Sequence, residues 1–97
     1  MTDKKISAII VDDEPLALEG LRLRLEKIPD VVVIGEAADG DEAIKQCQEL
    51  LPDVLFIDLQ LPGINGLEVV QSLQSDTMPM IVFVSAYSEY AVDAFDL

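Results

Sequence analysis

The chain has 97 residues, 51% of them hydrophobic, which predicts one folded domain and argues against disorder. Its 19 acidic and 6 basic residues give a net charge of -13, which argues against direct binding of nucleic acid because phosphates would be repelled. The sequence holds no histidine, which excludes a Ser-His-Asp triad and the usual zinc sites, so any metal should be a hard ion such as Mg²⁺.

The first elements are predicted from apolar patterning. Ile6 to Val11 is a β-branched run typical of a strand buried on both faces, and Pro15 suits the first turn of a helix. That helix should bury one apolar stripe, made of Leu18, Leu21, Leu25 and Ile28. On its outer side we expect Arg22 to pair with Glu26, four residues on. A second strand follows from Val31 to Ala37.

The middle of the chain repeats this alternation. Asp39 can cap a second helix, whose apolar face should be Ala43, Ile44, Cys47, Leu50 and Leu51. Val54 to Ile57 is a third buried strand, and Asp58 stands at its end. After a loop from Leu59 to Ile64, Asn65 can cap a third helix, which should bury Leu67, Val70 and Leu73.

The last part of the chain supplies one more strand and one more helix. Met80 to Val84 is the fourth apolar run, and Ser88 can cap a final helix. Buried strands that alternate with helices predict the α/β class, with a parallel sheet covered on both faces. The single cysteine, Cys47, allows no disulfide and most simply packs in the core. With no run long enough to span a bilayer, we expect a cytoplasmic protein without a membrane partner.

Acidic and hydroxyl side chains stand where these predicted strands end. Asp12 and Asp13 follow the first strand, Asp58 follows the third and Ser85 follows the fourth. Ligands of open parallel sheets bind beyond the carboxyl ends of the strands, and with a strand order of 2-1-3-4 the three carboxylates would share one crevice. Crowded carboxylates repel one another, and bound Mg²⁺ would relieve that repulsion.

Three segments carry a specific resemblance. They are Ile10-Val11-Asp12-Asp13-Glu14, Phe56-Ile57-Asp58-Leu59-Gln60-Leu61-Pro62-Gly63 and Val84-Ser85-Ala86. In order and spacing they resemble the receiver domain of two-component response regulators, along the whole chain. The resemblance implies a doubly wound, flavodoxin-like receiver fold with the strand order 2-1-3-4.

By this resemblance each site residue acquires a role. Asp58 is expected to be the phosphoacceptor and Ser85 the switch hydroxyl that moves toward the phosphoryl group. Asp13 is expected to bind Mg²⁺ directly, Asp12 through a water molecule, and Gln60 through its backbone carbonyl, with Asp58 also a ligand. Gly63 and Gly66 would shape the loop beneath.

The implied function is a switch in a phosphorelay. A sensor histidine kinase would phosphorylate Asp58 in a Mg²⁺-dependent step, and the receiver would catalyse only its own phosphotransfer and dephosphorylation. Homodimer formation on activation would then control a transcriptional output. Asp13 to Ala17 and Ser85 to Phe95 resemble the subgroup with LytTR-type (LytR/AlgR) DNA-binding domains. DNA would be bound only through such a C-terminal domain, which these residues do not include.

The sequence departs from the family pattern at its C-terminal end. The family has a fifth strand and helix, with a phosphate-binding lysine after that strand, and no lysine here occupies that place. Residues 1–97 are therefore expected to form a receiver truncated before its fifth βα unit, although a partner chain could supply the missing part. Without the lysine, phosphotransfer in these 97 residues should be weak.

Other interpretations stay open. Asp12 and Asp13 alone could solvate a turn or cap a helix, because polar residues are common at strand ends. A pseudo-receiver would keep the fold as an interaction module without being phosphorylated, although such domains usually lose one of the acids. A phosphatase of the haloacid dehalogenase type would need an acid two residues after its nucleophile, where this chain has Gln60.

Overall fold

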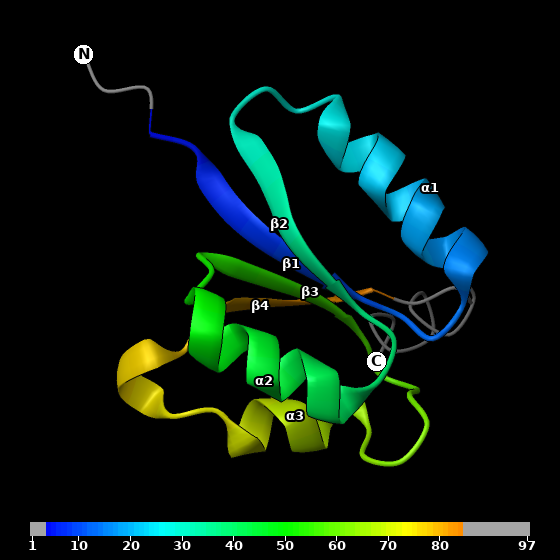
Figure 1. Ribbon diagram of the computed structural model, residues 1–97, viewed down its shortest axis with the longest axis vertical. Helices are drawn as coiled ribbons and strands as arrows, with labels where there is room; N and C mark the ends of the chain where they lie inside the picture. The colour runs from blue at the N-terminus through cyan, green and yellow to red at the C-terminus, as the bar shows by residue number, and fades with distance from the viewer. Residues whose placement is uncertain (1–3, 85–97) are drawn as a thin grey trace, which may run out of the picture.

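A computed structural model describes residues 4–84 of the chain (Figure 1). It contains a four-stranded parallel sheet with the order β2-β1-β3-β4, as predicted. The elements in chain order are β1 (Ile6–Val11), α1 (Pro15–Glu26), β2 (Val31–Ala37), α2 (Gly40–Leu50), β3 (Val54–Asp58), α3 (Gly66–Ser72), the 3₁₀ turn η1 (Ser75–Thr77) and β4 (Met80–Val84). The helix expected after Ser88 lies outside the described residues.

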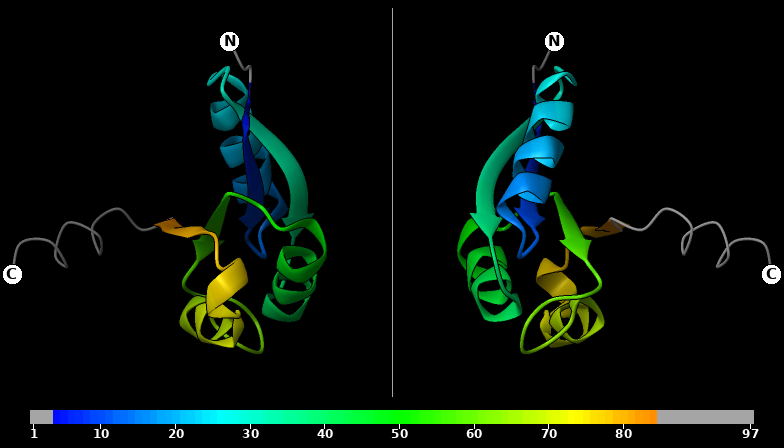
Figure 2. Two further views of the ribbon diagram at one scale, coloured as in Figure 1. Left: turned by 90° about the vertical axis from the view of Figure 1, so that its left-hand side faces the viewer. Right: turned by 90° about the vertical axis from the view of Figure 1, so that its right-hand side faces the viewer.

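The helices cover both faces of the sheet. Figures 1 and 2 show α1 on one face and α2 with α3 on the other. The main core lies between the sheet and these last two helices and consists of Ile9, Val11, Ala37, Ala43, Cys47, Leu55, Ile57 and Val69. The intervening strand residues Ala8 and Ile10 are also fully buried, as expected for β1 at the centre of a doubly wound sheet. No helix within residues 4–84 combines the length and the apolar character needed to cross a membrane.

Strand register brings two loops together at the carboxyl edge of the sheet. β1 and β3 are hydrogen-bonded neighbours, paired from Ala8 with Val54 to Val11 with Ile57. Asp12 follows Val11 directly, and Asp58 follows Ile57 as the last residue of β3, so the two acids lie side by side just past this last pair. The parallel arrangement of β1 and β3 therefore places the backbones of the two acids next to each other.

The starts of α2 and α3 are fixed by side-chain caps, both of which the sequence predicted. The Asp39 carboxylate accepts a hydrogen bond from the Glu42 N–H at 2.8 Å. The Asn65 side chain accepts one from the Glu68 N–H at 2.9 Å, and the Glu68 carboxylate accepts one from the Asn65 N–H at 2.9 Å. This reciprocal capping box satisfies two backbone donors and holds the first turn of α3 in place.

Two predicted helix faces extend too far. Ile28 was expected on the buried stripe of α1, but that helix ends at Glu26 and Ile28 is 46% exposed. Leu51 was expected on the apolar face of α2, but it ends the helix with a left-handed φ of 49° and is 57% exposed. Apolar periodicity continued past both helix ends, and the backbone turned before these side chains could reach the core.

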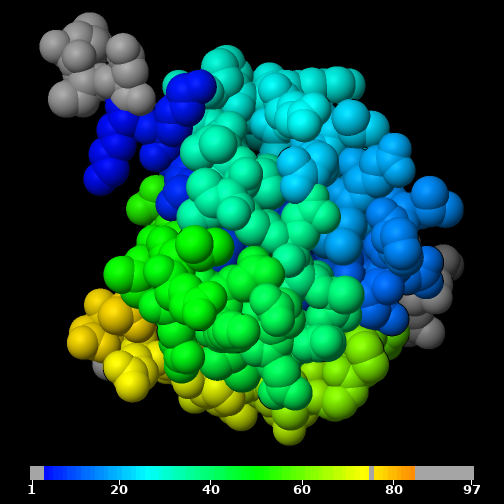
Figure 3. Space-filling model, in the orientation of Figure 1, coloured from blue at the N-terminus to red at the C-terminus, as the bar shows by residue number. Residues whose placement is uncertain are grey.

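Two further predictions were wrong about direction. Leu67 was expected to face inward, but it is 53% exposed, and Val69 is fully buried instead. Arg22 was expected to pair with Glu26 along α1, but it forms its salt bridge with Glu36 of β2. Figure 3 shows this face of the molecule, on which β2 lies between α1 and α2.

Candidate metal centre

The loop after β1 supplies two of the acids. The Asp12 N–H donates to the Ala37 carbonyl at 3.1 Å, which continues the β1–β2 pairing one residue past the strand. The Asp12 carboxylate accepts a hydrogen bond from the Glu14 N–H at 2.9 Å through its Oδ1 atom. This local turn, followed by Pro15 at the start of α1, fixes Asp12 firmly. Asp12 is 7% exposed, whereas Asp13 is exposed to solvent.

The loop after β3 supplies the third acid in the same manner. Asp58 is the last residue of β3, and its Oδ1 atom accepts a hydrogen bond from the Gln60 N–H at 3.0 Å. Among residues 4–84, no hydrogen bond reaches Oδ2 of Asp58. We call residues 59–64 the site loop. Gly63 lies in it with a φ of +76°, a conformation that residues with a side chain rarely adopt.

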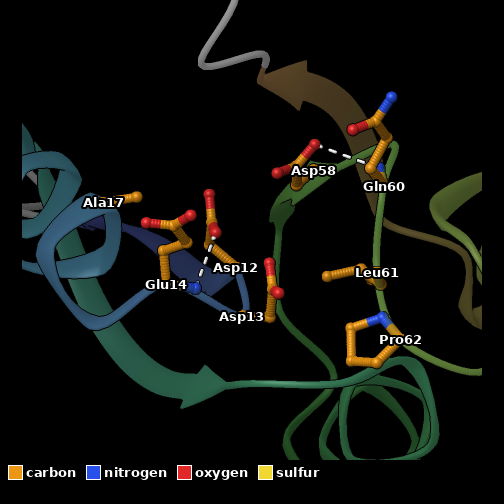
Figure 4. Close-up of a pocket in the computed structure, with 8 residues that line it drawn as sticks. All are labelled: Asp12, Asp13, Glu14, Ala17, Asp58, Gln60, Leu61 and Pro62. Atoms are coloured by element: carbon orange, nitrogen blue, oxygen red, sulfur yellow. Dashed lines mark hydrogen bonds between the residues drawn. The ribbon is translucent and has the colours of Figure 1, made fainter.

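The three carboxylates converge. One oxygen from each of Asp12, Asp13 and Asp58 lies within 4.8 Å of the others. They open into a pocket of about 540 Å³, and Figure 4 shows the loop after β1 and the site loop facing each other across it. The pocket is lined by Asp12, Asp13, Glu14, Ala17, Asp58, Gln60, Leu61 and Pro62. None of these lining residues is basic.

The electrostatics of the pocket are unfavourable for the protein alone. Burial raises the pKa of Asp12 above its ordinary value of 3.8, and the negative charges of Asp58, Asp13 and Glu14 raise it further, while the hydrogen bond from the Glu14 N–H acts in the opposite direction. A carboxylate that is both desolvated and crowded by like charges favours either a proton or a cation.

These donors fit a hard divalent cation. Carboxylate oxygens, with backbone carbonyls and water, are the ligands that Mg²⁺ takes in proteins. Two of the three carboxylates, those of Asp12 and Asp58, are held in place by N–H groups of their own loops before any ion binds. A cation here would also offset the charge that raises the pKa of Asp12.

Most of the site residues predicted from the sequence lie around this pocket. Asp12, Asp13 and Asp58 lie together, as predicted, and Gln60 lies on the pocket wall. The interaction that the structure shows for Gln60 is its N–H bond to Asp58, and a role for its carbonyl stays a prediction. Ser85 lies outside the described residues.

Sequence reasoning assigned no role in the pocket to Glu14 and Ala17, which also line it. The available signal for Glu14 was the run of three consecutive acids that begins at Asp12. Cys47 is buried, as predicted, and burial raises the pKa of its thiol to about 11. It therefore belongs to the core and contributes no nucleophile to the site.

Comparison with known proteins gives a consistent result. The family model described as the response regulator receiver domain matches residues 8–97. The transcriptional regulatory protein BtsR of Salmonella typhi is 50% identical over 91 residues, which cover 94% of this chain but 38% of that protein. The chain thus spans well under half the length of this curated relative.

Solved structures agree with the sequence comparison. The signal receiver domain of the response regulator NarL from Mycobacterium tuberculosis superposes with a TM-score of 0.80 at 34% identity, covering 92% of this chain and 73% of that one. A two-component response regulator of the LuxR family from an Aurantimonas species also superposes at 0.80 and 34% identity, covering 96% and 69%. The flavodoxin-like arrangement of the sheet and helices is therefore shared with these proteins.

Proposed function

The chain belongs to the response regulator receiver domain family, and from that premise we propose that it is the phosphoacceptor switch of a two-component signalling pathway. The observation that carries the proposal is the convergence of Asp12, Asp13 and Asp58 at the carboxyl edge of the sheet. Domains of this kind relay a signal, so the only catalysis we expect is the transfer and hydrolysis of its own phosphoryl group.

Asp58 is the proposed phosphoacceptor. The Gln60 N–H engages Oδ1, so Oδ2 is the oxygen that attacks the phosphorus of a phosphohistidine on a sensor histidine kinase. The bond from phosphorus to this oxygen forms as the bond to the imidazole nitrogen breaks, and the imidazole leaves. The pocket is large enough to admit the phosphoryl group beside Asp12 and Asp13.

Mg²⁺ is the proposed cofactor, held by Asp13 and Asp58 directly, by Asp12 through water and by the Gln60 carbonyl. When bound, it supplies positive charge that offsets the carboxylates and the transferring phosphoryl oxygens. The protein's own contribution is to hold Asp12 and Asp58 rigid through the N–H groups of Glu14 and Gln60. This fixed geometry lowers the cost of assembling the site at the moment of transfer.

The output side of the proposal comes from the resemblance. Ser85 would move toward the new phosphoryl group, and the surface after β4 would shift to a state that forms homodimers. BtsR of Salmonella typhi is described as a transcriptional regulatory protein, and we propose a cytoplasmic regulator with a DNA-binding output domain here too. A LytTR-type output domain is inferred from the sequence segments alone, since the relatives found are described as BtsR, NarL and LuxR-family proteins.

The test is intact-mass spectrometry after incubation with acetyl phosphate and Mg²⁺. It is made on the 97-residue chain, on a version extended through a fifth strand and helix, and on the Asp58→Ala variant of each. We expect one phosphoryl adduct on the extended protein, a weaker signal on the 97-residue chain, and none on either variant.

The controls separate the parts of the proposal. Omission of Mg²⁺, or addition of a chelator, should suppress the adduct on the extended protein. An adduct that survives Asp58→Ala would overturn the assignment of the acceptor. Complete absence of an adduct from both versions would reject phosphotransfer and favour an unphosphorylated interaction module.

A further inference from the structure

Two glycines lie against the site loop, and neither is a pocket residue. Gly66 is the first residue of α3, and a Cβ atom placed on it would lie 2.5 Å from the Asp58 carbonyl oxygen and 3.1 Å from Leu59 Cα. Gly40 is the first residue of α2, and a Cβ there would overlap Ile64 Cγ1 and lie 2.9 Å from Val69 Cγ2. Both glycines are buried, whereas Gly20 and Gly63 have open space at the same position.

The two glycines contact opposite ends of the site loop. Gly66 meets the backbone where the loop leaves β3, and its N–H also donates to the Leu59 carbonyl at 3.0 Å. Gly40 receives the side chain of Ile64, which ends the loop and packs against the main core. Gln60, whose N–H holds the Asp58 carboxylate, lies between these two points.

The helix starts that carry Gly40 and Gly66 are held by side-chain caps. Gly40 directly follows the Asp39 cap of α2, and Gly66 directly follows the Asn65 capping box of α3. Each helix start is therefore held by hydrogen bonds that do not involve the site loop. A side chain added at Gly66 would collide with backbone, which has no room to yield, but one added at Gly40 would push Ile64 and the end of the loop.

We propose that Gly40 and Ile64 are positioning residues, which set the Asp58 carboxylate and Gln60 from outside the pocket. Because Gly40 has no Cβ, the Ile64 side chain can pack directly against it. This contact holds the site loop in the position where the Gln60 N–H can donate to the Asp58 carboxylate. The inference rests on the proposed function for its metal-binding readout, but the geometry of the loop can be followed independently.

The experiment is a double-mutant cycle on Gly40→Ala and Ile64→Ala, with the Mg²⁺ dissociation constant measured by titration calorimetry on folded protein. We expect Gly40→Ala to weaken Mg²⁺ binding about tenfold, below the roughly hundredfold that a 1 Å misplacement of reacting groups can cost. In the Ile64→Ala background the clash with the site loop is removed, and the close contact that remains is with Val69 Cγ2, which lies in α3 outside the site loop. The same substitution should then change the constant by less than about twofold. Gly20→Ala, at a helical glycine with open space, is the matched control and should leave it unchanged.

A purely structural role would give a different result. If Gly40→Ala lowers the thermal midpoint but leaves Mg²⁺ affinity intact, the positioning role is wrong. An equal loss of affinity in both backgrounds would also overturn it, because the effect would then not pass through Ile64. If the wild-type chain binds no Mg²⁺, the proposed function fails, and the NMR shift of the Gln60 amide in the four proteins still decides whether Gly40 moves the loop.

Discussion

Aspartates lie at both ends of the parallel strands, and the two environments shift the pKa of an aspartate in opposite directions. We call the end at which the strands begin the amino edge and the end at which they finish the carboxyl edge. At the amino edge, the Asp53 carboxylate accepts hydrogen bonds from the Ser7 N–H at 2.9 Å and the Ser7 hydroxyl at 3.1 Å. These bonds, with the nearby charge of Lys4, lower the pKa of Asp53. At the carboxyl edge, burial and neighbouring acids raise the pKa of Asp12. One edge stabilises the charged form of its aspartate, and the other disfavours it.

The difference separates an aspartate that holds the fold from one that is available for chemistry. Asp53 also ties three strands together, since its N–H donates to the Ser7 carbonyl and its own carbonyl accepts from the Met80 N–H, each at 2.9 Å. The carboxylates of Asp12 and Asp58 each accept one hydrogen bond among the described residues. Two hydrogen bonds and a nearby positive charge stabilise the Asp53 carboxylate, whereas burial and neighbouring acids at the other edge favour binding of a cation by Asp12.

The largest expected effect tests whether chemistry is confined to the carboxyl edge. Asp58→Asn should abolish the phosphoryl adduct, because an amide oxygen is a far weaker nucleophile than a carboxylate. Asp53→Asn, the same substitution at the amino edge, should leave the extent of modification unchanged. Intact-mass spectrometry of both variants of the extended protein measures this, and equal loss in the two would break the distinction between the edges.

Ligand-linked stability should follow the same division. With Mg²⁺ at one hundred times its dissociation constant, binding to the folded state should add about 2.7 kcal/mol, which corresponds to a rise of roughly 10–20 °C in thermal midpoint for a domain of this size. Chelation should reverse the rise. Asp13→Asn should remove most of it and Asp53→Asn none of it, as measured by calorimetric scans. A rise that persists in Asp13→Asn would place the ion elsewhere.

The repulsion at the carboxyl edge should itself be measurable without metal. Because the pKa of Asp12 is raised in the folded state, its charged form costs stability, and this cost is absent at low pH and appears as the pH rises through the raised pKa. Burial of the carboxylate is the largest cause of this raised pKa, and the negative charges of Asp58, Asp13 and Glu14 add to it. Asp12→Asn keeps the acceptor for the Glu14 N–H and should stabilise the metal-free protein at neutral pH by roughly 1–3 kcal/mol.

Urea unfolding at several pH values checks this prediction. The gain from Asp12→Asn should shrink as the pH falls toward 3.8, the ordinary value for this carboxyl, and it should also shrink when Mg²⁺ is added to the wild type. A destabilising effect of the substitution at neutral pH without metal would mean that the Asp12 charge is compensated inside the pocket.

The sequence predicted the features that depend on local pattern. Apolar runs rich in β-branched residues predicted all four strands within a residue, and Asp39 and Asn65 were identified as caps from their position before apolar helices. Convergence of the acids followed because parallel strands end at a common edge. The strand order itself came from the resemblance, since local pattern does not decide which strands become neighbours.

Features that depend on tertiary contacts could not be predicted in this way. Leu67 and Val69 are both apolar residues of α3, and the packing of that helix against the rest of the domain decides that Val69 is buried and Leu67 is exposed. Arg22 forms its salt bridge with Glu36 of β2 and not with Glu26 of its own helix. The contact between Gly40 and Ile64 joins the start of α2 to the end of the site loop, 24 positions further along the chain, so neither residue carries a signal of it in the sequence.

The smallest expected effect concerns the amino edge. Because the pKa of Asp53 is lowered in the folded state, its charge contributes stability that is present above its ordinary value of 3.8 and is lost as the pH falls through the lowered pKa. Asp53 is exposed to solvent, so Asp53→Asn should lower the thermal midpoint at neutral pH by no more than a few degrees. Below the lowered pKa both proteins carry a neutral side chain there, and the difference should close.

The control for this last effect is Ser7→Ala, which removes one of the two hydrogen bonds from residue 7 to the Asp53 carboxylate and keeps the other, from its N–H. In that background the pH dependence of the Asp53→Asn difference should become weaker without disappearing. A difference that grows as the pH falls would reverse the sign of the linkage, and the amino edge would then resemble the carboxyl edge in disfavouring its charge.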